Sequence, residues 1–210
     1  KIMIRTYPRW IGLQVVFNEE YNQTATDLTS LIQRIKASNA EVFVALSLPN
    51  DAALIAKTVH QVDYRPRYYC QCGSQVVTLP NWKDLGEAGI NVFSTTMAWP
   101  GQPDRPGLDE LYAHLKETLG YEIMPAYAAG ALAILQVMQQ AVEDTKSLDQ
   151  RRLREYVATH EFKTAVGTLK YKSDGTPEFA AQLVQQQADG VKVVWPADAA
   201  TGEAVAPLRP

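Results

Sequence analysis

Short runs of β-branched and aromatic residues alternate with longer amphipathic segments along the first 95 residues, and this alternation constrains the fold more than any other feature. Residues 13–17 predict a strand, and residues 25–37 predict a helix whose apolar side chains recur at helical spacing. Residues 42–46 form a continuous apolar run, which is typical of a parallel strand buried on both faces. Strands joined by helices predict a parallel, doubly wound α/β sheet.

The same rhythm continues to residue 95. Pro49 and Asn50 predict a turn, and the side chain of Asn50 is suited to cap the helix that follows. Residues 67–70 and 92–95 predict a third and a fourth strand. This part of the chain is therefore expected to form one sheet with its helices.

The pattern changes near Trp99, because residues 99–107 hold three prolines and two glycines and predict a connector. Helices are expected after it, over residues 108–119, 125–143 and 148–159.

Strand patterns return near the end of the chain. Residues 168–171 predict a strand, and residues 182–187 and 191–195 flank an Asp-Gly pair, which is a strong hairpin signal. The tail from Pro196 is rich in Ala, Pro and Gly and is expected to fray.

The predicted helix over residues 125–143 is apolar on nearly every face and must be covered on nearly every face. No strands in this chain obviously build a second sheet for it. Part of the folding unit is therefore expected outside these residues or in another chain. Residues 123–142 carry no charge and approach a membrane-spanning length, but Pro125 and several glutamines favour a buried helix of a soluble protein.

Charge and motifs exclude several classes of function. The formal net charge is -3 and lysine and arginine do not cluster, which argues against a nucleic-acid partner. The chain contains no GxSxG, GxxxxGK[ST] or HExxH motif, and no GxGxxG follows a strand, so neither an enzyme nor a cofactor is expected.

Cysteines and histidines give no metal site. His60, His114 and His160 are scattered along the sequence. Cys70 and Cys72 are separated by one residue, and a bridge between them would close a very tight ring. They are interpreted as two free or partly buried thiols. The cysteines therefore do not show whether the protein belongs to an oxidising or a reducing compartment.

Ligands of open α/β sheets bind beyond the carboxyl ends of the strands. The segments that follow the predicted strands are residues 47–50, 71–74 and 96–99, which offer hydroxyls, an amide, a thiol, a thioether and an indole. Such a mixture suits a largely apolar pocket with a few polar groups. The alternative is that these are ordinary turn residues and that Trp99 fills a core or a hinge.

Several segments in order resemble the branched-chain amino acid type of ABC-transporter solute-binding protein, a type I periplasmic binding protein. The segments that carry the resemblance are residues 12–16 (GLQVV), 25–31 (ATDLTSL), 35–37 (IKA), 41–44 (EVFV), 49–53 (PNDAA), 124–131 (MPAYAAGA), 168–171 (TLKY) and 174–175 (DG). No single motif is specific, but their order and spacing match over almost the whole chain.

The resemblance implies two α/β lobes joined by three crossovers and closing on a ligand. Residues 1–95 would form most of the second lobe, and residues 96–107 a crossover and connector. Residues 108–166 would be the helical part of the first lobe. Residues 167–210 would hold a crossover and return to the second lobe with a hairpin and a tail. The rest of the first lobe is expected upstream of this sequence.

The expected ligand-binding residues come from the loops after the strands and from the start of one helix. They are Ser47, Leu48, Gln71, Cys72, Gly73, Ser74, Met97, Trp99 and Tyr127. Leucine-binding relatives usually carry an acidic residue in the loop that Gln71, Cys72 and Gly73 occupy here. Its absence favours an aromatic or aliphatic carboxylate, or an amide, over a standard α-amino acid.

The resemblance further implies a periplasmic or extracytoplasmic protein that closes on its ligand and then meets an ABC permease in the membrane. The N-terminus shows no signal-peptide core, as expected after cleavage or for an internal piece. Two alternatives stay open. One is a ligand-sensing domain of a receptor or regulator with the same fold, and the other is a flavodoxin-like enzyme or interaction module.

Overall fold

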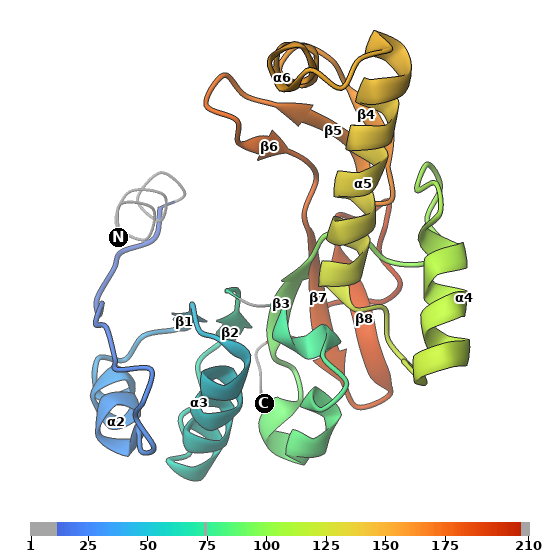
Figure 1. The fold of residues 1–210 in the computed structure, drawn as a ribbon. Helices are drawn as coiled ribbons and strands as arrows, with labels where there is room; N and C mark the ends of the chain where they lie inside the picture. Colours follow the sequence, from blue (N-terminus) through green and yellow to red (C-terminus); the bar gives the residue numbers. More distant parts are fainter. Residues whose placement is uncertain (1–11, 74, 207–210) are drawn as a thin grey trace.

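A computed structural model describes residues 12–73 and 75–206 (Figure 1). In chain order the elements are α2 (Thr29–Ala37), β1 (Val42–Ala45), α3 (Pro49–Gln61), β2 (Tyr68–Gln71), the 3-10 turns η1 (Val76–Thr78) and η2 (Trp82–Gly89), β3 (Phe93–Thr96), α4 (Leu108–Leu119), α5 (Ala126–Thr145), α6 (Gln150–Val157), β4 (Phe162–Thr164), β5 (Gly167–Tyr171), β6 (Pro177–Glu178), β7 (Gln182–Gln187) and β8 (Gly190–Trp195).

The larger sheet has the strand order β1-β2-β3-β7-β8. Strands β1, β2 and β3 are parallel, β7 runs antiparallel to β3, and β8 closes a hairpin with β7. The prediction of an α/β fold with a parallel sheet is therefore confirmed, and the hairpin forms around Asp189 and Gly190 as its sequence indicates. Strands β4, β5 and β6 form a separate three-stranded sheet that packs with α5 and α6.

Two hydrophobic cores lie on either side of the connections that follow β3 and precede β7. One core packs α2 and α3 against the larger sheet through residues such as Ile32, Phe43 and Ile55. The other joins α5, α6 and the smaller sheet through residues such as Val137 and Phe162. Figure 1 accordingly shows two bodies, with the larger sheet below and the helical body above.

Two expectations about the first strands are wrong. Residues 13–17 form no strand, because none of the described residues offers them a partner, and a strand requires pairing with a neighbour. In β1, Phe43 and Ala45 are buried, but Val42 and Val44 are 39% and 48% exposed. Strand β1 is thus an edge strand with one face uncovered, not a strand buried on both faces.

Helix α3 begins two residues earlier than the predicted Asn50 cap implies. Pro49 occupies its first turn, Leu48 is the N-cap residue, and Asn50 lies inside the helix, so the prediction of an Asn50 cap is wrong. Proline suits this place because its fixed φ is helical and the first N–H groups of a helix lack intrahelical partners.

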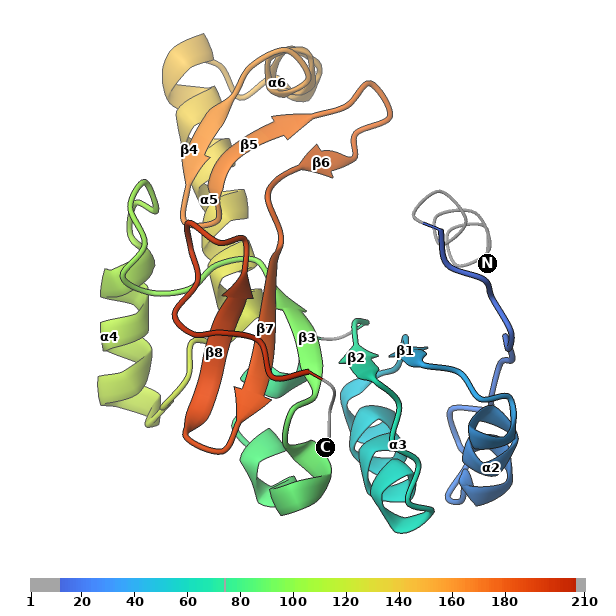
Figure 2. The same cartoon turned by 180° about the vertical axis from the view of Figure 1, so that it is seen from behind.

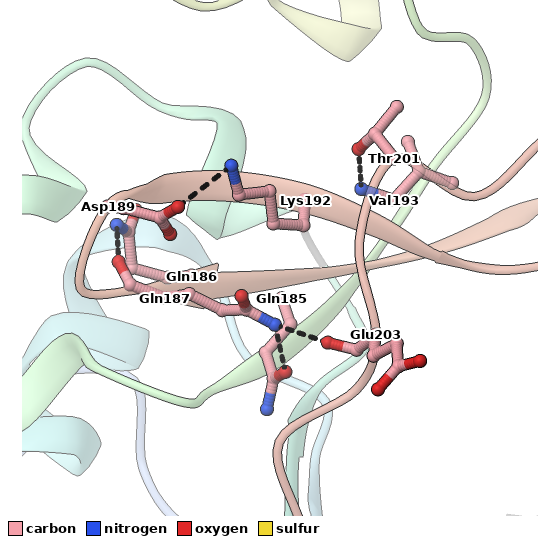
Figure 3. Close-up of polar contacts among 8 residues, drawn as sticks. All are labelled: Gln185, Gln186, Gln187, Asp189, Lys192, Val193, Thr201 and Glu203. Atoms are coloured by element: carbon pink, nitrogen blue, oxygen red, sulfur yellow. Dashed lines mark hydrogen bonds and ion pairs between the residues drawn. The ribbon is translucent and has the colours of Figure 1, made fainter.

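The predicted fraying of the tail is also wrong over residues 197–205. The side chain of Gln185 donates to the carbonyl of Val205 and accepts from its N–H, at 2.8 and 2.9 Å. Gln187 donates to the carbonyl of Glu203, and the hydroxyl of Thr201 accepts from the N–H of Val193 (Figure 3). Figure 2 shows the tail crossing the β7–β8 hairpin, to which these bonds fasten it.

Helix α5 buries a face of small residues and leaves large apolar ones exposed. Ala129, Ala133 and Ala141 are fully buried, whereas Ile134 and Leu135 are 62% and 66% exposed. The prediction that this helix needs cover from outside the chain agrees with that exposure. Among the described helices, none combines the length and apolarity that crossing a membrane requires.

Candidate functional site

The carboxyl ends of β1 and β2 bring Ser47 and Gln71 together. The hydroxyl of Ser47 donates to the side-chain carbonyl of Gln71 at 2.7 Å, and both residues are buried. The Gln71 amide in turn donates to the Tyr69 hydroxyl and, at 3.4 Å, to the carbonyl of Ala52. Gln71 is therefore held by internal bonds, and one of them orients the hydroxyl of Ser47.

Gly73 brings the loop after β2 against the loop after β1. A Cβ atom placed on Gly73 would lie 2.9 Å from the backbone nitrogen of Ser47 and 3.0 Å from the Cα atom of Leu46. These contacts are shorter than van der Waals separation, so only glycine fits without moving the backbone. Gly73 thus fixes how closely the two candidate binding loops approach.

Tyr21 and Asp51 belong to the same edge of the sheet and were missed in the sequence. The Tyr21 hydroxyl donates to a carboxylate oxygen of Asp51 at 3.1 Å, and Asp51 is only 9% exposed. Burial, together with the hydrogen bond and negative charge of Asp51, raises the pKa of Tyr21 to about 12. Asp51 lies in the first turn of α3, where the helix dipole favours a carboxylate, so its position is a sequence signal. Tyr21 carries no such signal, because its segment shows no hydrophobic periodicity.

Cys70 and Cys72 form a disulfide, so the prediction of free thiols is wrong. Side chains two residues apart on a strand point to the same face, and strand β2 ends between the two cysteines, at Gln71. Their Cα atoms come within 5.3 Å, which is inside the range that a disulfide spans. Among the described residues no cysteine is free, so Cys72 presents no thiol to a ligand.

The other candidates are spread over both bodies. Leu48 is exposed before α3, and Ser74 lies outside the described residues. Met97 packs against α5, since a Cβ atom on Gly130 would lie 3.1 Å from its sulfur. Tyr127 is 53% exposed in the first turn of α5, on the face that carries Gly130. Leu48 follows Ser47 directly in the chain, whereas Met97 and Tyr127 belong to the connection after β3 and to α5.

Trp99 lies where the chain passes between the two cores. Ala98 is buried in the core around α5, whereas Trp99 packs against the core of the larger sheet. Thr96 and Gln182 face each other in the ladder, so the connections after β3 and before β7 leave the sheet side by side. Gln182 also donates to the side chain of Gln102 at 2.6 Å, which ties the connector to β7.

The described residues include no group of three or more histidine, cysteine, aspartate or glutamate side chains placed to hold a metal ion. The candidate site thus consists of hydroxyl, amide and apolar groups, with the Tyr21–Asp51 pair at one side. Such groups suit the noncovalent binding of a small molecule.

Comparisons with known proteins agree on one family. The family profile described as periplasmic binding protein matches residues 4–192. Leu/Ile/Val-binding protein homolog 7 of Brucella abortus is 25% identical over 207 residues, which cover 94% of this chain and 52% of that protein. The chain therefore spans about half the length of this relative.

Solved structures share the fold. A leucine-binding protein from Thermotoga maritima superposes with a TM-score of 0.75 at 19% identity, covering 88% of this chain and 52% of that one. A solute-binding protein of an ABC transporter from R. palustris, in complex with 4-hydroxybenzoate, gives a TM-score of 0.67 at 17% identity, covering 94% and 53%.

Proposed function

The chain belongs to the periplasmic binding protein family, and on that premise we propose that it is part of a two-lobed extracytoplasmic protein that captures a small organic molecule by hinge closure. The observation that supports this most is the pair of adjacent connections between two separate cores. Paired connections let two rigid bodies rotate while few backbone angles change. A ligand that touches both bodies then stabilises the closed arrangement.

The two bodies correspond in this proposal to the two lobes. Residues 1–95 belong to the second lobe, residues 96–107 cross over, residues 108–166 belong to the first lobe, and residues 167–210 return. Ser47, Leu48 and Gly73 contact the ligand from the second lobe, and Tyr127 and Met97 from the first. The closed protein delivers its ligand to an ABC permease of the branched-chain amino acid family.

We further propose an aromatic or aliphatic carboxylate, or an amide, as the ligand class, in preference to leucine. The loop at Gly73 carries no carboxylate for a ligand ammonium, and an unpaired ammonium in a closed cleft is costly. Asp51 is nearby, but it is buried and already accepts from Tyr21. The complex of the R. palustris relative with 4-hydroxybenzoate supports this choice.

Titration calorimetry tests the ligand class. The polypeptide extended upstream to the length of its relatives is titrated with 4-hydroxybenzoate, benzoate and leucine. Saturable heat with an aromatic acid and none with leucine is the expected result. Tight leucine binding that Asp51→Asn abolishes would make Asp51 the ammonium partner and would overturn the proposal.

A matched pair of serine variants tests the site itself. Ser47→Ala removes the hydroxyl beside Gln71 and is expected to weaken binding about 10-fold, the equivalent of one hydrogen bond. Ser30→Ala removes a hydroxyl on the exposed face of α2, where it accepts from Arg34, and should leave affinity unchanged. Equal affinities for both variants would remove Ser47 from the site.

A further inference from the structure

The Cys70–Cys72 bridge joins two residues at the same end of β2 rather than two elements of the fold. Gln71 alone lies between the two cysteines. A disulfide stabilises a fold mainly by closing a loop in the unfolded chain, and this gain falls as the loop shortens. Neither cysteine belongs to the two hydrophobic cores of the described residues. Opening the bridge is therefore expected to leave both cores folded.

The bridge shortens the chain where β2 ends. The Cα atoms of Cys70 and Cys72 lie 5.3 Å apart. A strand rises about 3.2–3.4 Å per residue, so residues two positions apart in an extended strand lie about 6.4–6.8 Å apart. The bridged segment is thus contracted by about 1 Å relative to an extended strand. Without the bridge, the chain is able to extend at Cys72 by that amount.

This contracted segment leads directly into the candidate site. The N–H of Cys72 donates to the carbonyl of Ala45 at 3.0 Å, which closes the ladder between β1 and β2. The next residue, Gly73, lies so close to the loop after β1 that a Cβ atom would come within 2.9 Å of the Ser47 nitrogen. Because closely packed groups transmit a displacement to one another, extension at Cys72 also moves Gly73 relative to Ser47. The bridge therefore fixes how the two candidate binding loops lie against each other.

The two sulfur atoms differ in their surroundings. Cys70 lies within the ladder and pairs with Val44 and Phe93 of the neighbouring strands. Cys72 lies beyond the last residue of β2, half-buried and next to the exposed Gly73. Exchange begins when a thiolate attacks a disulfide sulfur that it is able to reach. The position of Cys72 at the rim of the sheet makes its sulfur the one attacked, and Cys70 the leaving group.

We propose that the Cys70–Cys72 bridge is a thiol–disulfide exchange site that a dithiol opens reversibly in the folded protein, and that its opening weakens ligand binding. A thiolate of the dithiol attacks the Cys72 sulfur and forms a mixed disulfide, while Cys70 leaves as a thiolate and takes up a proton. The second thiolate of the reductant then attacks the reductant's own sulfur and releases Cys72, which is protonated in turn. The protein gains two electrons and two protons, and the dithiol becomes a disulfide. The effect on the ligand rests on the binding function proposed above.

Dithiothreitol serves as the dithiol in a test on the polypeptide extended upstream to the length of its relatives. Alkylation and mass spectrometry at increasing dithiothreitol should show Cys70 and Cys72 becoming reduced while the circular dichroism stays unchanged. In the reduced protein, the Cys72 amide should exchange its hydrogen about 10-fold faster, because a ladder bond opens more often where the chain is able to extend. Reduction only together with unfolding, or unchanged exchange at Cys72, would overturn the proposal.

The other end of β2 supplies the matched control within the same experiment. The N–H of Tyr68 donates to the carbonyl of Glu41 at 3.0 Å, the same distance as the bond from Cys72 to Ala45. Its exchange rate should be equal in the oxidised and the reduced protein, because Tyr68 lies before the bridged segment. Faster exchange at both ends would show that reduction loosens the whole strand and would contradict a local effect.

Calorimetry with 4-hydroxybenzoate tests the coupling to the ligand. The reduced protein should bind about 10-fold more weakly than the oxidised protein, the equivalent of one hydrogen bond. Because coupling is reciprocal, saturating 4-hydroxybenzoate should shift the equilibrium with dithiothreitol toward the bridged form by the same factor. Equal affinities in the two states would refute the coupling. Binding to neither state would contradict the proposed ligand class instead, whereas the amide exchange needs no ligand and decides the exchange site in either case.

A double variant, Cys70→Ser with Cys72→Ser, separates this bridge from any other cysteine of the extended protein. Without dithiothreitol it should match the reduced parent protein in affinity and in amide exchange at position 72. Adding dithiothreitol should change neither quantity. A response of the double variant to dithiothreitol would place the effect at another cysteine and would count against the exchange site.

Discussion

Gly73→Ala is the most informative single change at the candidate site, because the added methyl group meets backbone atoms of the loop after β1. Its Cβ atom would lie 2.9, 3.0 and 3.1 Å from backbone atoms of Ser47 and Leu46. Carbon atoms in contact normally lie about 3.5–4.0 Å apart, so the two loops must separate by roughly half an ångström. The φ angle of Gly73 is not in the left-handed region, so alanine adds no backbone strain there. The change in stability therefore reports the steric clash.

The expected cost follows from two opposing effects. Overpacking a tight site costs about 1–3 kcal/mol. Replacing glycine by alanine lowers the entropy of the unfolded chain, which returns about 0.4–1 kcal/mol. The net loss is about 1–2 kcal/mol, which corresponds to a melting temperature about 2–8 °C lower for a chain of this size. Circular dichroism at increasing temperature measures this shift.

Gly202→Ala is the matched control. Its Cβ atom would also come close to a neighbour, at 3.1 Å, but the nearest atoms belong to the Lys192 side chain and not to backbone, and no contact is closer than 3.1 Å. The control is therefore expected to stay within about 0.5 kcal/mol of the parent protein. Equal melting temperatures for the two variants would refute the close approach of the two loops at Gly73.

Three further predictions, tested with four variants, concern other parts of the structure. Burial raises the pKa of Tyr64 from 10.0 to about 12, so stability present below pH 10 should fall by up to about 1.4 kcal/mol per pH unit until pH 12. In Tyr64→Phe, the free energy of unfolding measured in urea should fall less steeply between pH 10 and pH 12. An unchanged slope would contradict the raised pKa of Tyr64. Gln185→Ala removes both bonds to Val205 and should cost about 1–3 kcal/mol, with faster thermolysin cleavage of the tail, whereas an unchanged cleavage rate would count against its anchoring. Leu135→Lys, at a 66% exposed position of α5, should change the stability of the 210-residue chain by less than about 0.5 kcal/mol. Val137→Lys, at a 4% exposed position, should unfold the helical body, and similar urea midpoints for both lysine variants would show that α5 is packed differently.

The sequence predicted those elements whose signals are local. Helix α4 matches the predicted residues 108–119, and β7 matches residues 182–187, because helical spacing and an Asp-Gly turn act within a few residues. Residues 13–17 carry an equally clear strand pattern but form no strand, because pairing depends on a distant partner. The uncovered face of β1 was missed for the same reason.

Part of the candidate site followed from topology and part did not. The carboxyl ends of parallel strands meet at one edge, which is why Ser47, Gln71 and Gly73 could be grouped from the sequence. The bond between Tyr21 and Asp51 joins residues thirty positions apart, and no spacing rule predicts it. The Cys70–Cys72 bridge depends on where β2 ends, which the sequence located only to within one residue.

Small-angle X-ray scattering of the upstream-extended protein, with and without the ligand that calorimetry identifies, tests hinge closure most directly. Closure of two lobes on a bound molecule predicts a smaller radius of gyration at saturation and no change with a compound that does not bind. An unchanged radius at saturating ligand would contradict capture between the lobes.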